Sequence, residues 1–432
     1  MNANKLTKII VLGFIILLLF APIIQQQTRL IQIKPLEGFF EQSNNPKFAV
    51  DSFFNGSYQT EKEKYIDQNY GFRNFLIRLN NQLDFWFLDK IHSEKVVLGK
   101  NGMLYEDHYI VSYLGENFLG ESKIDELTSK IKKLQDYFSQ KNKTLLIILA
   151  PGKATFFPDL FPPLFDREKK RNNYEEFAAQ FLSKGINTID FNSWFKAKKG
   201  KTPFPLYTEL GIHWTLYGSS LAFDSIVKYI EVKRNIDLPD YLIDKYESPD
   251  ELRFPDDDIY RALNLTFNMK HVKASYPLIR VHNDSTKTQP TLLTIGDSYW
   301  WNIYNTAVCG SVFKEGRFWY YNKEAFPESF TKQTFVETLD FKKVIEETDV
   351  ITLCFTESTL ITIGNGFIEK AYETFCKNSL SAEEKKIRIE NLMKYIRNDK
   401  KWMEGIKTRS EKEKLPVDSI VFYDARWQVE HN

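Results

Sequence analysis

The sequence has few cysteines and histidines for its length. Three cysteines occur among 432 residues, Cys309, Cys354 and Cys376, and Cys354 lies in an apolar run that is typical of a buried strand. An odd and sparse set argues against a disulfide framework, so we expect buried thiols. The six histidines show no paired spacing of the kind that binds zinc. We therefore predict no metal site and no cofactor.

Net charge is also nearly absent. The 58 basic and 57 acidic residues leave a net charge of +1, so no overall field attracts nucleic acid, and we expect no nucleic-acid partner. The length allows two or three average domains, or one large α/β domain with additional segments. Aromatic residues make up 15% of the chain. This share fits a large core, and it fits carbohydrate contacts equally well.

A long apolar run occurs at the N-terminus. Residues 9–24 are almost all apolar, and Lys5 and Lys8 precede them. A membrane-spanning helix usually needs about 20 residues, and neighbouring residues extend the run toward that length. No small-x-small cleavage signal follows, which favours an uncleaved signal anchor over a removed signal peptide. Positive charge before the run predicts a single-pass protein of the cytoplasmic membrane, with its bulk facing the periplasm or the outside.

Periodicity and composition divide the remaining chain into three parts. After the anchor, residues 1–30, we expect a tether with a leading helix in residues 31–90, the helix covering residues 59–87. Residues 91–375 alternate helical segments with β-branched and aliphatic runs, which predicts a mostly parallel sheet with helices on both faces. Residues 376–432 carry apolar residues at helical spacing amid many charges. They predict a helical C-terminal appendage.

Two helix starts are marked by capping patterns. Ser122 is followed by Asp125, and Ser381 is followed by Glu384. A hydroxyl with a carboxylate three residues later is typical of a helix N-terminus, so we expect helices to begin at these serines.

Polar residues follow three of the predicted strands. In a parallel sheet the carboxyl ends of the strands lie along one edge, where open α/β folds place their ligands. We therefore expect one cleft to contain the polar residues that follow the runs ending at Ala150, Ile295 and Phe355, which are Lys153, Ser298 and Glu357.

Ser298 is the candidate nucleophile. The segment Gly296-Asp297-Ser298 follows an apolar strand and enters a helix, so free N–H groups near Ser298 can receive an oxyanion. Serine is a poor nucleophile unless a base lies within hydrogen-bond reach. His213 is the best candidate for that base, because the other five histidines lack a comparable setting.

Together these segments resemble the alginate O-acetyltransferase group of SGNH-hydrolase-like proteins over most of the chain. In ordinary SGNH hydrolases the Gly-Asp-Ser block comes early and the histidine late, whereas here the histidine precedes the serine, as in the alginate group. The resemblance implies an SGNH-like, flavodoxin-like α/β fold. It is carried by residues 68–73, 99–105 and 150–153, by His213-Trp214-Thr215 and by Gly296-Asp297-Ser298-Tyr299.

The resemblance also implies a function. It predicts acetyl transfer onto, or off, the hydroxyls of a cell-surface or secreted polysaccharide, through an acyl intermediate on Ser298 with His213 as the base. In such systems a membrane-bound O-acyltransferase passes the acyl group outward, and it is the implied donor partner. The alternative is a catalytically degenerate module that binds glycans or acts as a scaffold in a polysaccharide-modification complex.

The chain departs from the group at the residue that orients the histidine. The group has aspartate two residues before the histidine, where this chain has Gly211, and the spacing of ordinary SGNH hydrolases places Leu210. We expect Glu357 to substitute, because it follows a neighbouring strand, and Glu209 is a weaker alternative. A Ser–His dyad whose imidazole is held by a backbone carbonyl also stays open.

Lys153 is the remaining candidate for the site. One interpretation is a cation at the edge of the cleft that binds an acidic sugar or a developing oxyanion. The other is a solvated loop lysine, and the sequence favours neither.

Overall fold

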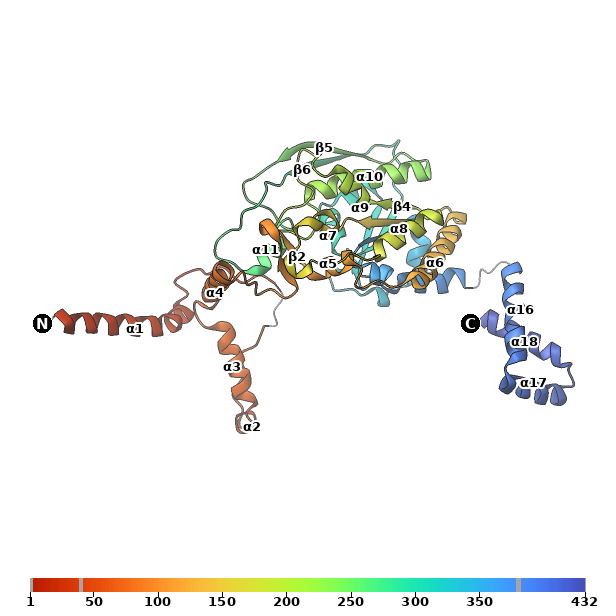
Figure 1. Cartoon of the computed structure of the whole chain (residues 1–432), viewed down its shortest axis with the longest axis horizontal. Coiled ribbons are helices and arrows are strands. Elements are labelled where there is room, and N and C mark those ends of the chain that lie inside the picture. Colours follow the sequence, from red (N-terminus) through yellow and green to blue (C-terminus); the bar gives the residue numbers. More distant parts are fainter. Residues whose placement is uncertain (1–2, 39–41, 378–381, 432) are drawn as a thin grey trace.

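The computed structural model describes residues 3–38, 42–377 and 382–431. Figure 1 shows an α/β body with a helical arm at the N-terminal end and a group of helices at the C-terminal end. Helix α1 (Ala3–Thr28) projects away from the body. Its segment Lys5–Thr28 is long and apolar enough to cross a membrane, with a mean hydropathy of 2.6. A signal sequence near an N-terminus has the same length and composition.

Three further helices form the arm: α2 (Val50–Phe54), α3 (Ser57–Asn69) and α4 (Arg73–Leu88). The expectation of one helix over residues 59–87 is wrong, because the chain breaks between α3 and α4, where Phe72 has a φ of 65°. Next to the break, Gly71 packs directly against the backbone of Pro22 in α1, where a β-carbon would collide. A continuous helix does not allow this backbone conformation.

The body is built on a six-stranded sheet. Its order is β4-β3-β10-β7-β8-β9, and every neighbouring pair is parallel except β8 with β9. This confirms the mostly parallel sheet expected from the sequence. The strands are β3 (Thr144–Ala150), β4 (Thr188–Asp190), β7 (Thr291–Gly296), β8 (Glu315–Tyr320), β9 (Glu324–Phe326) and β10 (Val350–Thr356).

Helices cover both faces of this sheet. Alternate residues of β3 point to opposite faces, so Leu146 and Ile148 enter one apolar cluster while Leu145 and Ile147 enter the other. All seven residues of β3 are buried, which explains why its sequence is a continuous apolar run. One face packs on α5 (Asp107–Leu114), α9 (Phe191–Lys198) and α10 (Leu216–Arg234), and the other on α6 (Glu121–Gln140), α8 (Asn173–Ser183), α14 (Phe341–Glu347) and α15 (Phe367–Ala371).

Two of the smaller expectations have clear outcomes. The helix expected to begin at Ser122 begins at Glu121, after Gly120 with a φ of 87°, so Ser122 lies inside α6 and does not cap it. The pattern at Ser381 lies outside the described residues. All three cysteines are buried, as expected.

Two antiparallel hairpins were not predicted. One pairs β1 (Val96–Leu98) with β2 (Leu104–Glu106), and the other pairs β5 (Asp240–Glu247) with β6 (Tyr276–His282). Between β5 and β6 the chain makes a long excursion that contains the short helix α11 (Asp258–Leu263). This excursion carries the residue that completes the site.

The C-terminal residues form helices, as expected. They are α16 (Ala382–Asn398), α17 (Lys400–Glu413) and α18 (Val417–His431). The three pack around an apolar cluster of their own, which contains Ile396, Ile406 and Ile420.

Candidate active site

His213 lies between a serine and an aspartate. Its Nε2 is 2.9 Å from Ser298 Oγ, and its Nδ1 is 2.5 Å from Asp258 Oδ2. The side chains of His213 and Asp258 are only 12% and 15% exposed, so water screens their interaction weakly. The three residues have the arrangement of a nucleophile, a base and an orienting acid.

The turn that presents Ser298 is fixed by its neighbour Asp297. Strand β7 ends at Gly296, and Ser298 begins the short 3-10 helix Ser298–Trp300. The Asp297 carboxylate accepts hydrogen bonds from Thr356 N at 2.7 Å, Thr356 Oγ1 at 2.9 Å and Thr359 Oγ1 at 2.6 Å. Asp297 therefore joins the nucleophile turn to the end of β10.

The loop that carries His213 is tied to the same turn. The Tyr299 hydroxyl donates to Ile212 O at 2.6 Å, and the Trp214 indole donates to Tyr299 O at 3.1 Å. Farther along, Asn302 Nδ2 donates to Trp214 O at 2.7 Å. These bonds on both sides of His213 fix its position relative to Ser298.

Asp258 holds the histidine and its backbone together. Its Oδ1 accepts from Ile212 N at 2.9 Å and from Ile259 N at 2.8 Å, which leaves Oδ2 for His213. Another bond joins the same helix to the histidine loop, from Tyr260 N to Leu210 O at 3.0 Å. The acid is thus well oriented, although it comes 45 positions after the histidine.

Gly211 allows the segment that carries Asp258 to pack directly against the histidine loop. A β-carbon on Gly211 would lie 2.7 Å from Asp256 O and 3.2 Å from Pro255 O. Thr208 Oγ1 donates to the same Asp256 carbonyl at 2.5 Å and holds the two segments together. A side chain at position 211 would therefore collide with the segment that carries Asp258.

The structure corrects the expectation that Glu357 supplies the acid. Glu357 is 2% exposed and accepts hydrogen bonds from the amide and the hydroxyl of Thr155. The reason is the strand order: β10 lies between β3 and β7, and Glu357 turns toward the end of β3 rather than toward Ser298. Burial raises the pKa of Glu357 to about 7. Glu209 also points elsewhere, since its Oε2 accepts from Val272 N at 2.9 Å.

Lys153 fits neither interpretation made from the sequence. It is fully buried at the start of α7 (Lys153–Phe156), so it is not a solvated lysine and it does not reach the edge of a cleft. Its Nζ donates to Glu209 O at 2.9 Å and to Gly211 O at 2.7 Å. Burial lowers the pKa of Lys153 to about 7. Lys153 therefore holds the backbone just before His213.

The charges around His213 favour its protonated form. Burial lowers the pKa of His213, but the charge and the hydrogen bond of Asp258 outweigh this, so the pKa lies above its ordinary value. Asp297 and Glu106 act in the same direction as Asp258. Within the described residues, no group of three or more His, Cys, Asp or Glu side chains could hold a metal ion.

The sequence did not indicate Asp258, and it did not indicate two further residues near the pair. Glu106, at the end of β2, is half-buried, and its pKa is raised by this partial burial and by the negative charge of Asp258 nearby. Burial also raises the pKa of Tyr321, although a hydrogen bond with the Ser298 side chain opposes that shift. Tyr321 therefore stays protonated at neutral pH, as a hydrogen-bond donor beside the nucleophile.

Part of the chain matches a known family. Residues 96–247 match the family described as "SGNH hydrolase-like domain, acetyltransferase AlgX". Over these residues the chain is similar to an SGNH hydrolase-like domain. This confirms the resemblance inferred from the motifs. The matched segment includes His213 and ends before Asp258 and Ser298. No curated protein sequence matches the chain.

Several solved structures are similar in fold. The O-acetyltransferase domain of Pseudomonas putida AlgJ is 16% identical, with 65% of this chain and 99% of that chain covered and a TM-score of 0.41. Pseudomonas aeruginosa AlgX is 14% identical over 63% of this chain and 67% of its own, with a TM-score of 0.40. Bacillus cereus PatB1 with a sulfonyl adduct is 11% identical over 61% and 97%, with a TM-score of 0.40. These scores are low, and the assignment of the site depends on contacts within this chain.

Proposed function

We propose that this protein is a membrane-anchored, extracytoplasmic O-acyltransferase that carries an acetyl group on Ser298 and passes it to a hydroxyl of a polysaccharide. The observation that carries the proposal is the continuous hydrogen-bond chain from Asp258 through His213 to Ser298. These two hydrogen bonds argue against a degenerate binding module, since such a module does not need an oriented base.

In the first half of the reaction, His213 Nε2 takes the proton of Ser298 as Oγ attacks the carbonyl carbon of the acetyl donor. Asp258 holds the imidazole in the required tautomer and stabilises the imidazolium that forms. The Tyr321 side chain interacts with that of Ser298, and its hydroxyl is the proposed donor to the developing oxyanion. Collapse of the tetrahedral intermediate expels the donor's leaving group, which takes the proton from His213, and the acetyl group stays on Ser298.

The second half reverses the roles. His213 takes a proton from a sugar hydroxyl, whose oxygen attacks the acetyl carbonyl, and then returns the proton to Ser298 as the ester bond to the enzyme breaks. Water in place of the sugar would make the protein an acetylesterase. A membrane-bound O-acyltransferase is the proposed donor, because the anchor α1 would keep this domain at the membrane surface.

The test uses the full chain in detergent micelles with a chromogenic acetyl ester. Intact mass is expected to show one acetyl group on the wild type and none on Ser298→Ala. His213→Ala should lose the activity too, and the double variant should be little worse than either single variant, because the pair acts as one unit. Additive losses would contradict a shared mechanism. A wild type that forms no adduct but binds a polysaccharide would support the binding module.

The anchor has its own test. N-terminal sequencing of the mature protein is expected to begin within residues 1–8, and a reporter fused after the last residue should be active only outside the cytoplasm. A mature N-terminus downstream of Ile24 would contradict the anchor.

A further inference from the structure

The helix that carries Asp258 is held in place by the N-terminal arm. Two buried side chains of α4, Asn81 and Gln82, are 8% and 1% exposed. Asn81 Nδ2 donates to Leu263 O, the last residue of α11, at 3.0 Å. Gln82 Oε1 accepts from Thr266 N at 3.1 Å and from Phe267 N at 2.9 Å. One turn of α4 thus binds the backbone at and just after the end of α11.

Neighbouring contacts strengthen this connection. Arg78 donates to Leu265 O at 3.2 Å, and its other terminal nitrogen donates to Pro35 O at 2.8 Å. One turn after Gln82 in α4, the Trp86 ring stacks on the Phe267 ring with centroids 5.2 Å apart. Helix α4 therefore contacts the chain after α11 through both polar and apolar groups.

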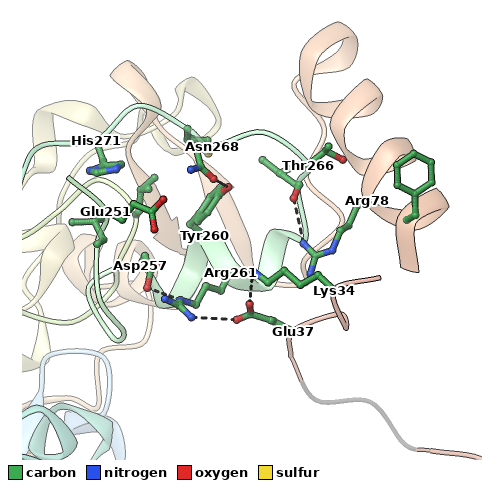
Figure 2. Close-up of a pocket in the computed structure, with 15 residues that line it drawn as sticks. Lys34, Glu37, Arg78, Glu251, Asp257, Tyr260, Arg261, Thr266, Asn268 and His271 are labelled. Carbon is green, nitrogen blue, oxygen red and sulfur yellow. Dashed lines mark hydrogen bonds and ion pairs between the residues drawn. The ribbon is translucent and has the colours of Figure 1, made fainter. Parts of the chain in front are cut away.

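The segment that leads out of α1 binds the same helix. Asn264 directly follows α11 and has a φ of 50°. It exchanges two hydrogen bonds with the backbone of Glu37, at 2.8 and 2.9 Å. Arg261 lies between Asp257, at 2.7 Å, and Glu37, at 3.9 Å, as Figure 2 shows. The contacts of α4 and of Glu37 are together called the clamp below.

A pocket of about 450 Å³ lies between the clamp and α11, lined by Glu37, Arg78, Asp257, Tyr260 and Leu210 among others (Figure 2). Tyr260 and Arg261 of α11 face this pocket, so specific contacts rather than close packing connect this side of the helix to the clamp. The helix has only six residues, of which Ile259 and Leu263 are buried. A helix of this length is not stable by itself, so its position depends on its contacts.

We propose that Asn81 and Gln82 are positioning residues for the catalytic acid, because they fix the end of α11 and thereby the approach of Asp258 to His213. The inference rests on the proposed function. It makes residues 31–90 part of the catalytic apparatus rather than a passive tether. A partner or a membrane that moves the arm would then alter the active site through α11.

The test compares Asn81→Leu and Gln82→Leu with Asn80→Leu, the same change at the adjacent, exposed position of α4. Acylation of Ser298 by the chromogenic ester is measured with the full chain in detergent from acid to alkaline pH. We expect the first two variants to be about 10- to 100-fold slower, as for a small misplacement of a reacting group, and Asn80→Leu to match the wild type.

The pH profile separates positioning from a general loss of folded protein. Asp258, Asp297 and Glu106 all raise the pKa of His213, and only Asp258 lies on the clamped helix. If Asp258 moves away, the pKa of His213 falls, and the acid limb of the profile shifts to lower pH. Partial unfolding reduces the rate at all pH values and leaves the acid limb unchanged.

Conservative variants complete the design. Gln82→Glu keeps an acceptor for the two amides and should recover most of the rate, whereas Asn81→Asp keeps the shape but loses the donated N–H and should not. The inference would be overturned by wild-type rates in the leucine variants, or by slower rates with an unchanged acid limb. In either case an acyl adduct on Ser298 of the wild type would still support the proposed function. A wild type that forms no adduct overturns the proposed function and this inference with it.

Discussion

Gly211 and Asp256 are in such close contact that a β-carbon at position 211 would lie 2.7 Å from the Asp256 carbonyl oxygen. The backbone of residues 255–258 thus occupies the space that any side chain at position 211 would need. From this segment Asp258 reaches Nδ1 of His213. The acid of this site therefore comes from a distant part of the chain, and the glycine is a condition of that arrangement.

Substitutions at Gly211 should therefore reduce activity. Gly211→Ala and Gly211→Asp both force the backbone at Asp256 to move, which withdraws Asp258 from His213. We expect the acylation rate to fall at least tenfold in each, on the order of the effect of a small misplacement. The rate of ester turnover measures this, with thermal unfolding as a check of the fold. A faster enzyme with aspartate at position 211 would show instead that the local acid is the better one.

The variant Asp258→Asn keeps the shape of the acid and removes its charge. By analogy with the same change in a serine protease triad, the acylation rate should fall on the order of 10³- to 10⁴-fold. Asp258 raises the pKa of His213 against the opposing effect of burial, so its loss lowers that pKa. The residual activity should extend to lower pH than in the wild type, and a pH–rate profile measures this shift. An unchanged rate would mean that His213 works unassisted.

Glu357→Gln should leave the acylation rate unchanged, because Glu357 binds Thr155 and not the histidine. Its effect should appear in stability. The folded state holds the pKa of this carboxyl at about 7, above its ordinary value of 4.5, so folding favours its protonated form. The free energy of unfolding should decrease as the pH rises from 4.5 through 7, by up to about 3 kcal/mol, and glutamine removes this dependence. Denaturant unfolding at several pH values measures it.

Lys153→Met should change both the pH dependence of stability and the acylation rate. Burial holds the pKa of Lys153 at about 7, below its ordinary value of 10.5. The unfolded chain therefore binds more protons between these values, and stability rises with pH across that window. Methionine fills a similar volume without a charge, and unfolding should lose this pH dependence. The carbonyls of Glu209 and Gly211 lose their donor, so the histidine loop loosens and the acylation rate should fall on the order of tenfold.

The sequence predicted the parts of the fold that depend on local patterns. Strands β3 and β10 are buried along their whole length, so their apolar runs are unambiguous. Ser298 follows such a strand, and its place at the carboxyl edge of the sheet comes from the topology alone. The proximity of His213 to Ser298 was inferred from motif order and resemblance. In the structure, His213 Nε2 lies 2.9 Å from Ser298 Oγ.

The rest depends on contacts that no local pattern specifies. Asp258 belongs to a run of three aspartates after Pro255, and that run marks an acidic turn without showing which carboxylate faces the histidine. The expectation for Glu357 assumed that a residue at the end of any neighbouring strand would reach His213. Strand β10 lies between β3 and β7, and Glu357 faces the end of β3 rather than His213. The sequence left the role of Lys153 open because its partners are distant along the chain: its Nζ donates to the carbonyls of Glu209 and Gly211, which lie 56 and 58 positions away.

The close fit between Gly211 and the 255–258 backbone also limits how this site could have evolved. An aspartate at position 211 and the present course of residues 255–258 compete for the same space, so an ancestor could not have carried both acids in their working positions. Residue 211 can therefore gain a side chain only if the course of residues 255–258 changes with it. Among related chains, the excursion between β5 and β6 should accordingly change its course together with residue 211.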